Sequence, residues 1–145
     1  MMPAVSSRVR PRVLLADDYA GLLKAWARLL EPSCDVVGSV RDGRALLDAA
    51  VALKPDVIVA DLAMPEVSGL DVCRTIKALL PQTKVVLVTA GGDENVARAA
   101  FRAGASAFVL KFAAAQDLHV AIERALTGDE YCTPTVRMKS AESTR

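Results

Sequence analysis

Three carboxylates, one hydroxyl and one ammonium stand at similar places in this sequence, each ending or directly following a short apolar run. They belong to Asp17, Asp18, Asp61, Thr89 and Lys111. Three carboxylates brought together raise one another's pKa unless a cation joins them. Oxygen ligands favour a hard divalent ion, above all Mg²⁺. With that ion, Asp61 can act as a carboxylate nucleophile toward phosphorus, and Thr89 and Lys111 can bind the phosphoryl oxygens.

The apolar runs that precede these side chains are typical of buried parallel strands. They are short, rich in β-branched residues and bounded by turn residues. Between them, apolar residues recur at helical spacing, as Leu23, Trp26 and Leu30 do in the first such segment. The strand-like runs cover residues 13–16, 36–40, 57–60, 84–89 and 107–110.

This alternation predicts an α/β fold in which a strand and a helix repeat five times. The expected fold is a doubly wound, flavodoxin-like five-stranded parallel sheet with strand order 2-1-3-4-5 and helices on both faces. Ligands of such folds bind outside the carboxyl ends of the strands, where the five polar side chains converge. We expect a flexible tail over residues 1–11, one domain over 12–131, and a tail or the start of a linker over 132–145.

Composition restricts the function further. The chain has 145 residues, 52% of them hydrophobic, which is enough for one domain core. The net charge of +1 argues against a dedicated nucleic-acid surface. Cys34, Cys73 and Cys132 are widely spaced and only one histidine is present, which argues against a zinc site and for a reducing compartment. With no signal peptide or membrane-spanning apolar run, we expect a cytoplasmic protein without membrane contact.

Over residues 11–131 the sequence resembles the receiver domains of bacterial two-component response regulators. Four motifs carry the resemblance: an acid pair after the first strand, an Asp-x-x-Met-Pro-x-x-x-Gly run after the third, a threonine after the fourth and a lysine after the fifth. Together they form a highly specific combination. They occur in LLADD (14–18), VIVADLAMPEVSGLD (57–71), VVLVTA (85–90) and AGASAFVLK (103–111).

The resemblance implies a role for each residue of the acidic cluster. Asp61 would be the phosphoacceptor and Asp18 a direct Mg²⁺ ligand. Asp17 would act mainly through metal-bound water. The backbone carbonyl of Ala63 would complete the metal site.

The resemblance also implies a switch. Thr89 and Lys111 would bind the phosphoryl group, and Thr89 would move toward it while Phe108, the aromatic residue of the fifth strand, turns inward. Most relatives follow the lysine with a proline in a cis peptide, but here Phe112 follows. A cis bond before a residue other than proline costs roughly 2.5–4 kcal/mol. We therefore expect the Lys111–Phe112 peptide to be trans, with some change in how Lys111 approaches the site.

The function implied is that of a phosphorylation-activated signalling switch, not an enzyme. A sensor histidine kinase would phosphorylate Asp61, and the change would pass to the face made by the fourth helix, the fifth strand and the fifth helix, altering a partner or homodimer contact. Residues 124–134 resemble the end of receivers of the NarL/FixJ/LuxR type, which a linker and a DNA-binding domain usually follow. The expected output is transcription through such a domain outside this chain, which itself should not bind DNA. The alternative is a stand-alone receiver that acts through protein contacts.

Two other classes of protein fit less well. A Mg²⁺-dependent phosphatase with an aspartyl nucleophile usually has Asp-x-Asp on its first strand, whereas this chain has the adjacent pair Asp17 and Asp18. An FMN-binding flavodoxin needs a loop rich in hydroxyls and glycines after the first strand, where this chain has ADDYAG (16–21).

Overall fold

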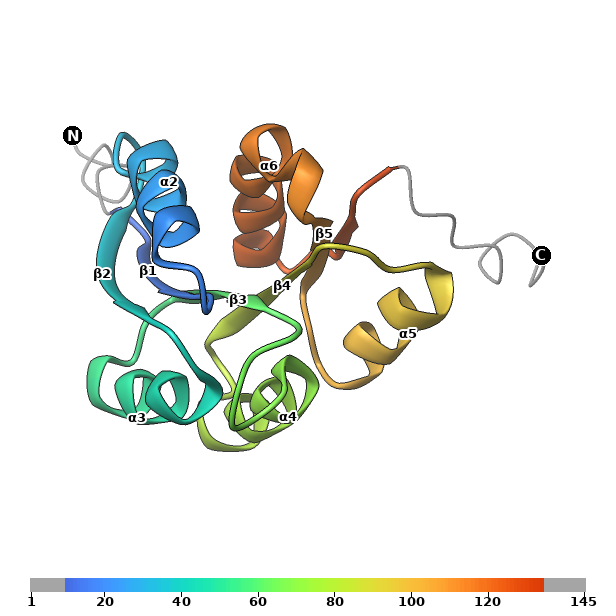
Figure 1. Cartoon of the computed structure of the whole chain (residues 1–145), viewed down its shortest axis with the longest axis horizontal. Coiled ribbons are helices and arrows are strands. Elements are labelled where there is room, and N and C mark those ends of the chain that lie inside the picture. The colour runs from blue at the N-terminus through green and yellow to red at the C-terminus, as the bar shows by residue number, and fades with distance from the viewer. Residues whose placement is uncertain (1–9, 135–145) are drawn as a thin grey trace.

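The structure, a computed structural model, describes residues 10–134, and these form one parallel sheet between two layers of helices (Figure 1). The strand order is β2-β1-β3-β4-β5-β6. Its first five positions confirm the predicted order 2-1-3-4-5. The strands are β1 (Arg12–Ala16), β2 (Asp35–Val40), β3 (Val57–Asp61), β4 (Lys84–Thr89), β5 (Ala107–Leu110) and β6 (Tyr131–Cys132).

The helices lie on both faces of the sheet. One face packs against α2 and α6, and the other packs against α3, α4 and α5 (Figure 1). A short 3₁₀ helix, η1, joins β5 to α6. The bounds are α2 (Ala20–Leu30), α3 (Gly43–Leu53), α4 (Gly69–Leu79), α5 (Glu94–Arg102), η1 (Lys111–Ala113) and α6 (Ala114–Thr127). Among residues 10–134, no helix is long and apolar enough to cross a bilayer.

Burial on both faces explains why the strand sequences are continuously apolar. In β1, Val13 and Leu15 join the core beneath α2 and α6, while Leu14 and Ala16 join the core beneath α3, α4 and α5. Side chains of a strand point alternately to opposite faces, so a strand covered on both sides needs apolar residues at every position. Trp26 of α2 is buried in the first of these cores.

Local signals place the helix ends where the sequence predicts them. The Ser68 side chain caps α4 by accepting the Asp71 N–H at 3.3 Å. Gly104 follows α5 with a φ of 108°, a left-handed conformation that glycine adopts readily. These two signals fix the start of the helix after β3 and the turn into β5.

The sixth strand is the feature that the sequence did not predict. After α6, Tyr131–Cys132 pairs in parallel with β5, and Thr133 is buried. The predicted domain boundary at residue 131 therefore falls inside this strand. A strand of two residues is too short to show alternation, so its sequence is typical of a tail. Most of the predicted tails, 1–9 and 135–145, lies outside the described residues.

Candidate functional site

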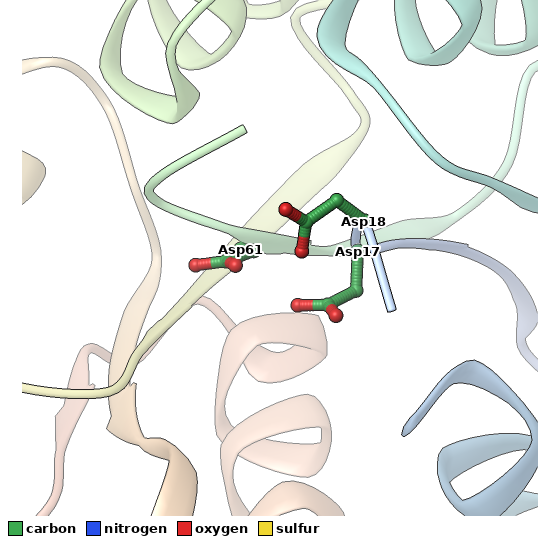
Figure 2. Close-up of side chains that lie close together, drawn as sticks. All are labelled: Asp17, Asp18 and Asp61. Atoms are coloured by element: carbon green, nitrogen blue, oxygen red, sulfur yellow. The ribbon is translucent and has the colours of Figure 1, made fainter. Parts of the chain in front are cut away.

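The carboxyl ends of two neighbouring strands bring the three acidic side chains together (Figure 2). Asp17 and Asp18 directly follow β1, and Asp61 is the last residue of β3. Each offers a carboxylate oxygen, and these oxygens all lie within 4.8 Å of one another. Asp17 and Asp61 are buried, whereas Asp18 is exposed. The cluster is thus closed beneath and open toward solvent at Asp18.

Lys111 reaches the two buried acids from the end of β5. Its Nζ lies 2.8 Å from Asp17 Oδ1 and 3.0 Å from Asp61 Oδ2. No cis peptide bond occurs in residues 10–134, so the peptide between Lys111 and Phe112 is trans, as expected. The chain enters η1 at Lys111, and the exposed Phe112 side chain points away from the core. The ammonium therefore meets both carboxylates from a strand end whose next peptide is trans.

Backbone N–H groups hold the buried carboxylates in place. Asp17 Oδ2 accepts the N–H of Tyr19 at 2.9 Å, and Asp61 Oδ1 accepts the N–H of Ala63 at 3.1 Å. Both oxygens of each acid therefore have a partner, one from the backbone and one from Lys111. The sequence does not indicate the Tyr19 contact, because a backbone donor leaves no mark in side-chain chemistry.

Burial and charge oppose one another at this site. Burial raises the pKa of Asp61 above its ordinary value, and the hydrogen bonds from Lys111 and the Ala63 N–H oppose that rise. For Lys111, burial acts to lower the pKa, but the contacts with Asp17 and Asp61 outweigh it and the pKa is raised. Lys111 is therefore a cation at neutral pH and favours the ionised carboxylate of Asp61.

Thr89 and Phe108 lie on the neighbouring strands β4 and β5. Thr89 ends β4, is buried, and donates its hydroxyl hydrogen bond to the carbonyl of Gly91 at 3.0 Å. The Phe108 ring is fully buried beneath the same loop. A Cβ built at Gly92 would lie 2.9 Å from Phe108 Cζ and 3.4 Å from Thr89 Cγ2. A side chain at position 92 would thus meet both predicted switch residues.

Thr133 is a further polar residue near the site, and the sequence motifs do not include it. It is buried, and its hydroxyl accepts the N–H of Leu110, the residue before Lys111, at 3.0 Å. It lies in the segment predicted to be a tail, and no periodicity in the sequence marks it.

Comparison of the sequence with known proteins finds a matching family and similar proteins. Residues 13–123 match the response regulator receiver domain family. The uncharacterized transcriptional regulatory protein YxjL of Bacillus subtilis is 34% identical over 120 residues, which cover 81% of this chain and 55% of YxjL. The response regulator protein VraR of Staphylococcus aureus is 31% identical over 130 residues, covering 88% of this chain and 62% of VraR. The chain thus spans 55–62% of the length of these two relatives.

Solved structures agree with the sequence comparison. A two-component response regulator of the LuxR family from Aurantimonas sp. superposes with a TM-score of 0.86 at 28% identity, covering 94% of this chain and 99% of that one. The isolated receiver domain of RcsB from Salmonella enterica, in the presence of the phosphomimetic BeF₃⁻, has a TM-score of 0.80 at 26% identity, covering 88% and 96% of the two chains. On its family match, sequence relatives and fold, the chain belongs to the response regulator receiver domain family.

Proposed function

We propose that this chain is a phosphorylation-activated signalling switch and that Asp61 accepts the phosphoryl group. The observation that carries the proposal is the contact of Asp61 with Lys111 inside a cluster that also holds Asp17 and Asp18. Asp61 lies beside a cation and beside two other acids that could hold a metal ion with it. Positive charge at this position suits a reaction that adds negative charge. Thr89 and Lys111 bind the phosphoryl group, and Phe108 takes part in the switch.

The acidic cluster fits a single Mg²⁺ ion. Its three carboxylates lie within 4.8 Å of one another, and the exposed Asp18 leaves room for the waters that Mg²⁺ keeps. As the resemblance to receiver domains implies, Asp17 acts mainly through metal-bound water. Asp18, Asp61 and the Ala63 carbonyl are then the direct protein ligands. When bound, the ion offsets negative charge on the phosphoryl oxygens.

The reaction is transfer from a phosphohistidine of a sensor kinase. A carboxylate oxygen of Asp61 attacks phosphorus, and a P–O bond forms while the P–N bond breaks and the imidazole leaves with the electron pair. Lys111 favours the ionised form of Asp61 against the effect of burial and then binds a phosphoryl oxygen. The Thr89 hydroxyl leaves the Gly91 carbonyl and donates to another of these oxygens. The chain forms and slowly loses its own phosphate but turns over no separate substrate.

The output proposed is control of transcription, with this chain as the receiver over residues 12–131. One relative is named a transcriptional regulatory protein, and RcsB, a structural relative, has been solved as two dimers bound to two parallel DNAs. By analogy, phosphorylation changes the face made by α5, β5 and α6, promotes a homodimer, and acts on DNA through a separate domain. We assign the protein to the cytoplasm, where sensor kinases present their phosphohistidine.

Phosphorylation by a small donor tests the central proposal. Incubation with Mg²⁺ and acetyl phosphate should raise the intact mass by one phosphoryl group, and Asp61→Asn should abolish the rise. Chelation of Mg²⁺ with EDTA should prevent it in the unaltered chain. Asp48→Asn, which changes an exposed acid of α3, is the matched control and should be phosphorylated normally. An unmodified wild-type chain under these conditions would refute the proposal.

A further inference from the structure

The short strand β6 lies along the free side of β5, the strand that leads into Lys111 (Figure 1). The N–H of Tyr131 donates to the Ser106 carbonyl at 3.2 Å, and the N–H of Thr133 donates to the Phe108 carbonyl at 3.0 Å. The segment that follows α6 is therefore bonded to the strand that carries both a predicted switch residue and the approach to the site.

Thr133 ends this pairing through its side chain. Its hydroxyl oxygen accepts the N–H of Leu110 at 3.0 Å, and Thr133 is only 1% exposed. A longer parallel strand would offer a backbone carbonyl to this N–H. Here the chain leaves the sheet after Thr133, and Pro134 already lies in a turn. The threonine hydroxyl takes the place of the missing carbonyl.

Leu110 is the last residue of β5, and the backbone leaves it directly into Lys111 and η1. The place where β5 ends fixes the Cα of Lys111, from which the side chain extends to Asp17 and Asp61 at 2.8 and 3.0 Å. A buried N–H left without a partner is costly, so losing the Thr133 acceptor favours a shift of this strand end toward water or another partner. Such a shift would displace Lys111.

We infer that Thr133 is a positioning residue for Lys111. Through the Leu110 N–H it holds the end of β5 from which the ammonium meets Asp61. This inference rests on the proposed function, since the effect of Lys111 is read as phosphorylation of Asp61. It gives the segment after α6 a part in the phosphoryl site, although Thr133 lies more than 20 residues further along the chain than Lys111.

A set of threonine variants separates positioning from mere stability. Thr133→Val keeps the shape of the side chain and removes the acceptor, whereas Thr133→Ser retains it. Thr83→Val is the matched control, because Thr83 is 4% exposed and its hydroxyl donates to the Pro55 carbonyl at 2.8 Å, at the opposite end of β4 from the site. The rate of phosphorylation by acetyl phosphate with Mg²⁺ and the free energy of unfolding in urea are measured for each variant.

Thr133→Val should slow phosphorylation about fivefold or more, the factor that corresponds to ~1 kcal/mol. Thr133→Ser should restore the rate, and Thr83→Val should lose stability but keep the wild-type rate. In a Lys111→Ala background, Thr133→Val should slow the residual reaction no further, because the two residues act through one contact. If Thr133→Val does not fold, Thr133→Ala, which also removes the acceptor, is judged by the same criteria.

Two kinds of failure are distinct. A wild-type chain that takes up no phosphoryl group would overturn the proposed function itself. A phosphorylated wild type with Thr133→Val as fast as wild type, or slowed only as much as Thr83→Val, would overturn the role of Thr133 alone. An equal slowing by Thr133→Val with and without Lys111 would also overturn it.

Discussion

Asp61 is buried, and a lone carboxylate at its position would destabilise the fold. The ammonium of Lys111 beside it offsets that loss of stability. Burial raises the pKa of Asp61, Asp17 adds a second buried acid, and Lys111 opposes both from 3.0 Å. Clustered acids of this kind lower stability, and proteins keep such costs mainly at functional sites. Burial also raises the pKa of a thiol outside this site, that of Cys73.

The thiol of Cys73 should make stability fall in alkaline solution. Cys73 is fully buried in α4, and burial raises the pKa of its thiol from 9.0 to about 11. In the unfolded chain the thiol ionises from about pH 9, whereas in the folded chain it stays protonated until about pH 11, so stability is lost as the pH rises through this window. Between pH 8 and pH 10, wild type should lose about 1 kcal/mol more unfolding free energy than Cys73→Ala. Urea titrations at the two pH values measure this, and equal losses would contradict it.

The loop between β4 and α5 lies close to β5 at Gly92, where a side chain would not fit. Gly91 and Gly92 follow one another there, yet only Gly92 faces the core, against the ring of Phe108 and a methyl group of Thr89. Neither glycine has a left-handed φ, so space and not backbone conformation distinguishes them. The packing of β5 against this loop therefore depends on the absence of one Cβ.

Alanine at these two glycines should have opposite effects. The Cβ of Gly92→Ala would lie 2.9 Å from Phe108 Cζ, and because that ring is fully buried we expect a loss of about 1–3 kcal/mol in unfolding free energy. The Cβ of Gly91→Ala would meet nothing within 4 Å, so its stability should be unchanged or higher by about 0.4–1 kcal/mol. Urea denaturation compares the two, and a Phe108→Leu background should reduce the penalty at Gly92. Equal effects of the two alanines would contradict this prediction, because they would show that the Phe108 ring moves aside at little cost.

The molecule as a whole concentrates the residues of its candidate site at one edge of the sheet. All its described strands run in parallel, so their carboxyl ends meet there, and Asp18, Asp61 and Lys111 arrive from three different strands. A ligand that binds this edge contacts the ends of β1 and β3 together. Binding at the edge is therefore coupled to the stability of the entire fold.

Mg²⁺ should stabilise the chain in proportion to its binding. A ligand that binds only the folded state at 100 times its Kd adds about 2.7 kcal/mol to the unfolding free energy. We expect the thermal midpoint of wild type to rise with Mg²⁺ concentration and that of Asp18→Asn, which changes the exposed acid proposed as a ligand, to rise far less. Asp48→Asn alters an exposed acid outside the cluster and should respond as wild type does. A wild-type midpoint that does not depend on Mg²⁺ would count against the metal site.

Most of the fold and the membership of the cluster could be predicted from the sequence alone. Strands buried on both faces must be apolar at every position, and polar residues at their ends are then conspicuous, so the residue order sufficed to place Asp17, Asp61 and Thr89 at one edge of the sheet. The trans peptide after Lys111 followed from the cost of the cis form. These properties are local in sequence or follow from a parallel topology.

The tertiary structure alone decided the contacts between distant segments. β6 has two residues and no periodicity, and its position depends on free backbone groups of β5, which the sequence does not display. The contact between Thr133 and Leu110 spans 23 residues, and the packing of Gly92 against Phe108 depends on the path of a loop. The side-chain chemistry visible in the sequence identified the residues that could react. Only folding determined which of them meet and what holds them, because hydrogen bonding and packing across elements depend on distances in space and not on spacing along the chain.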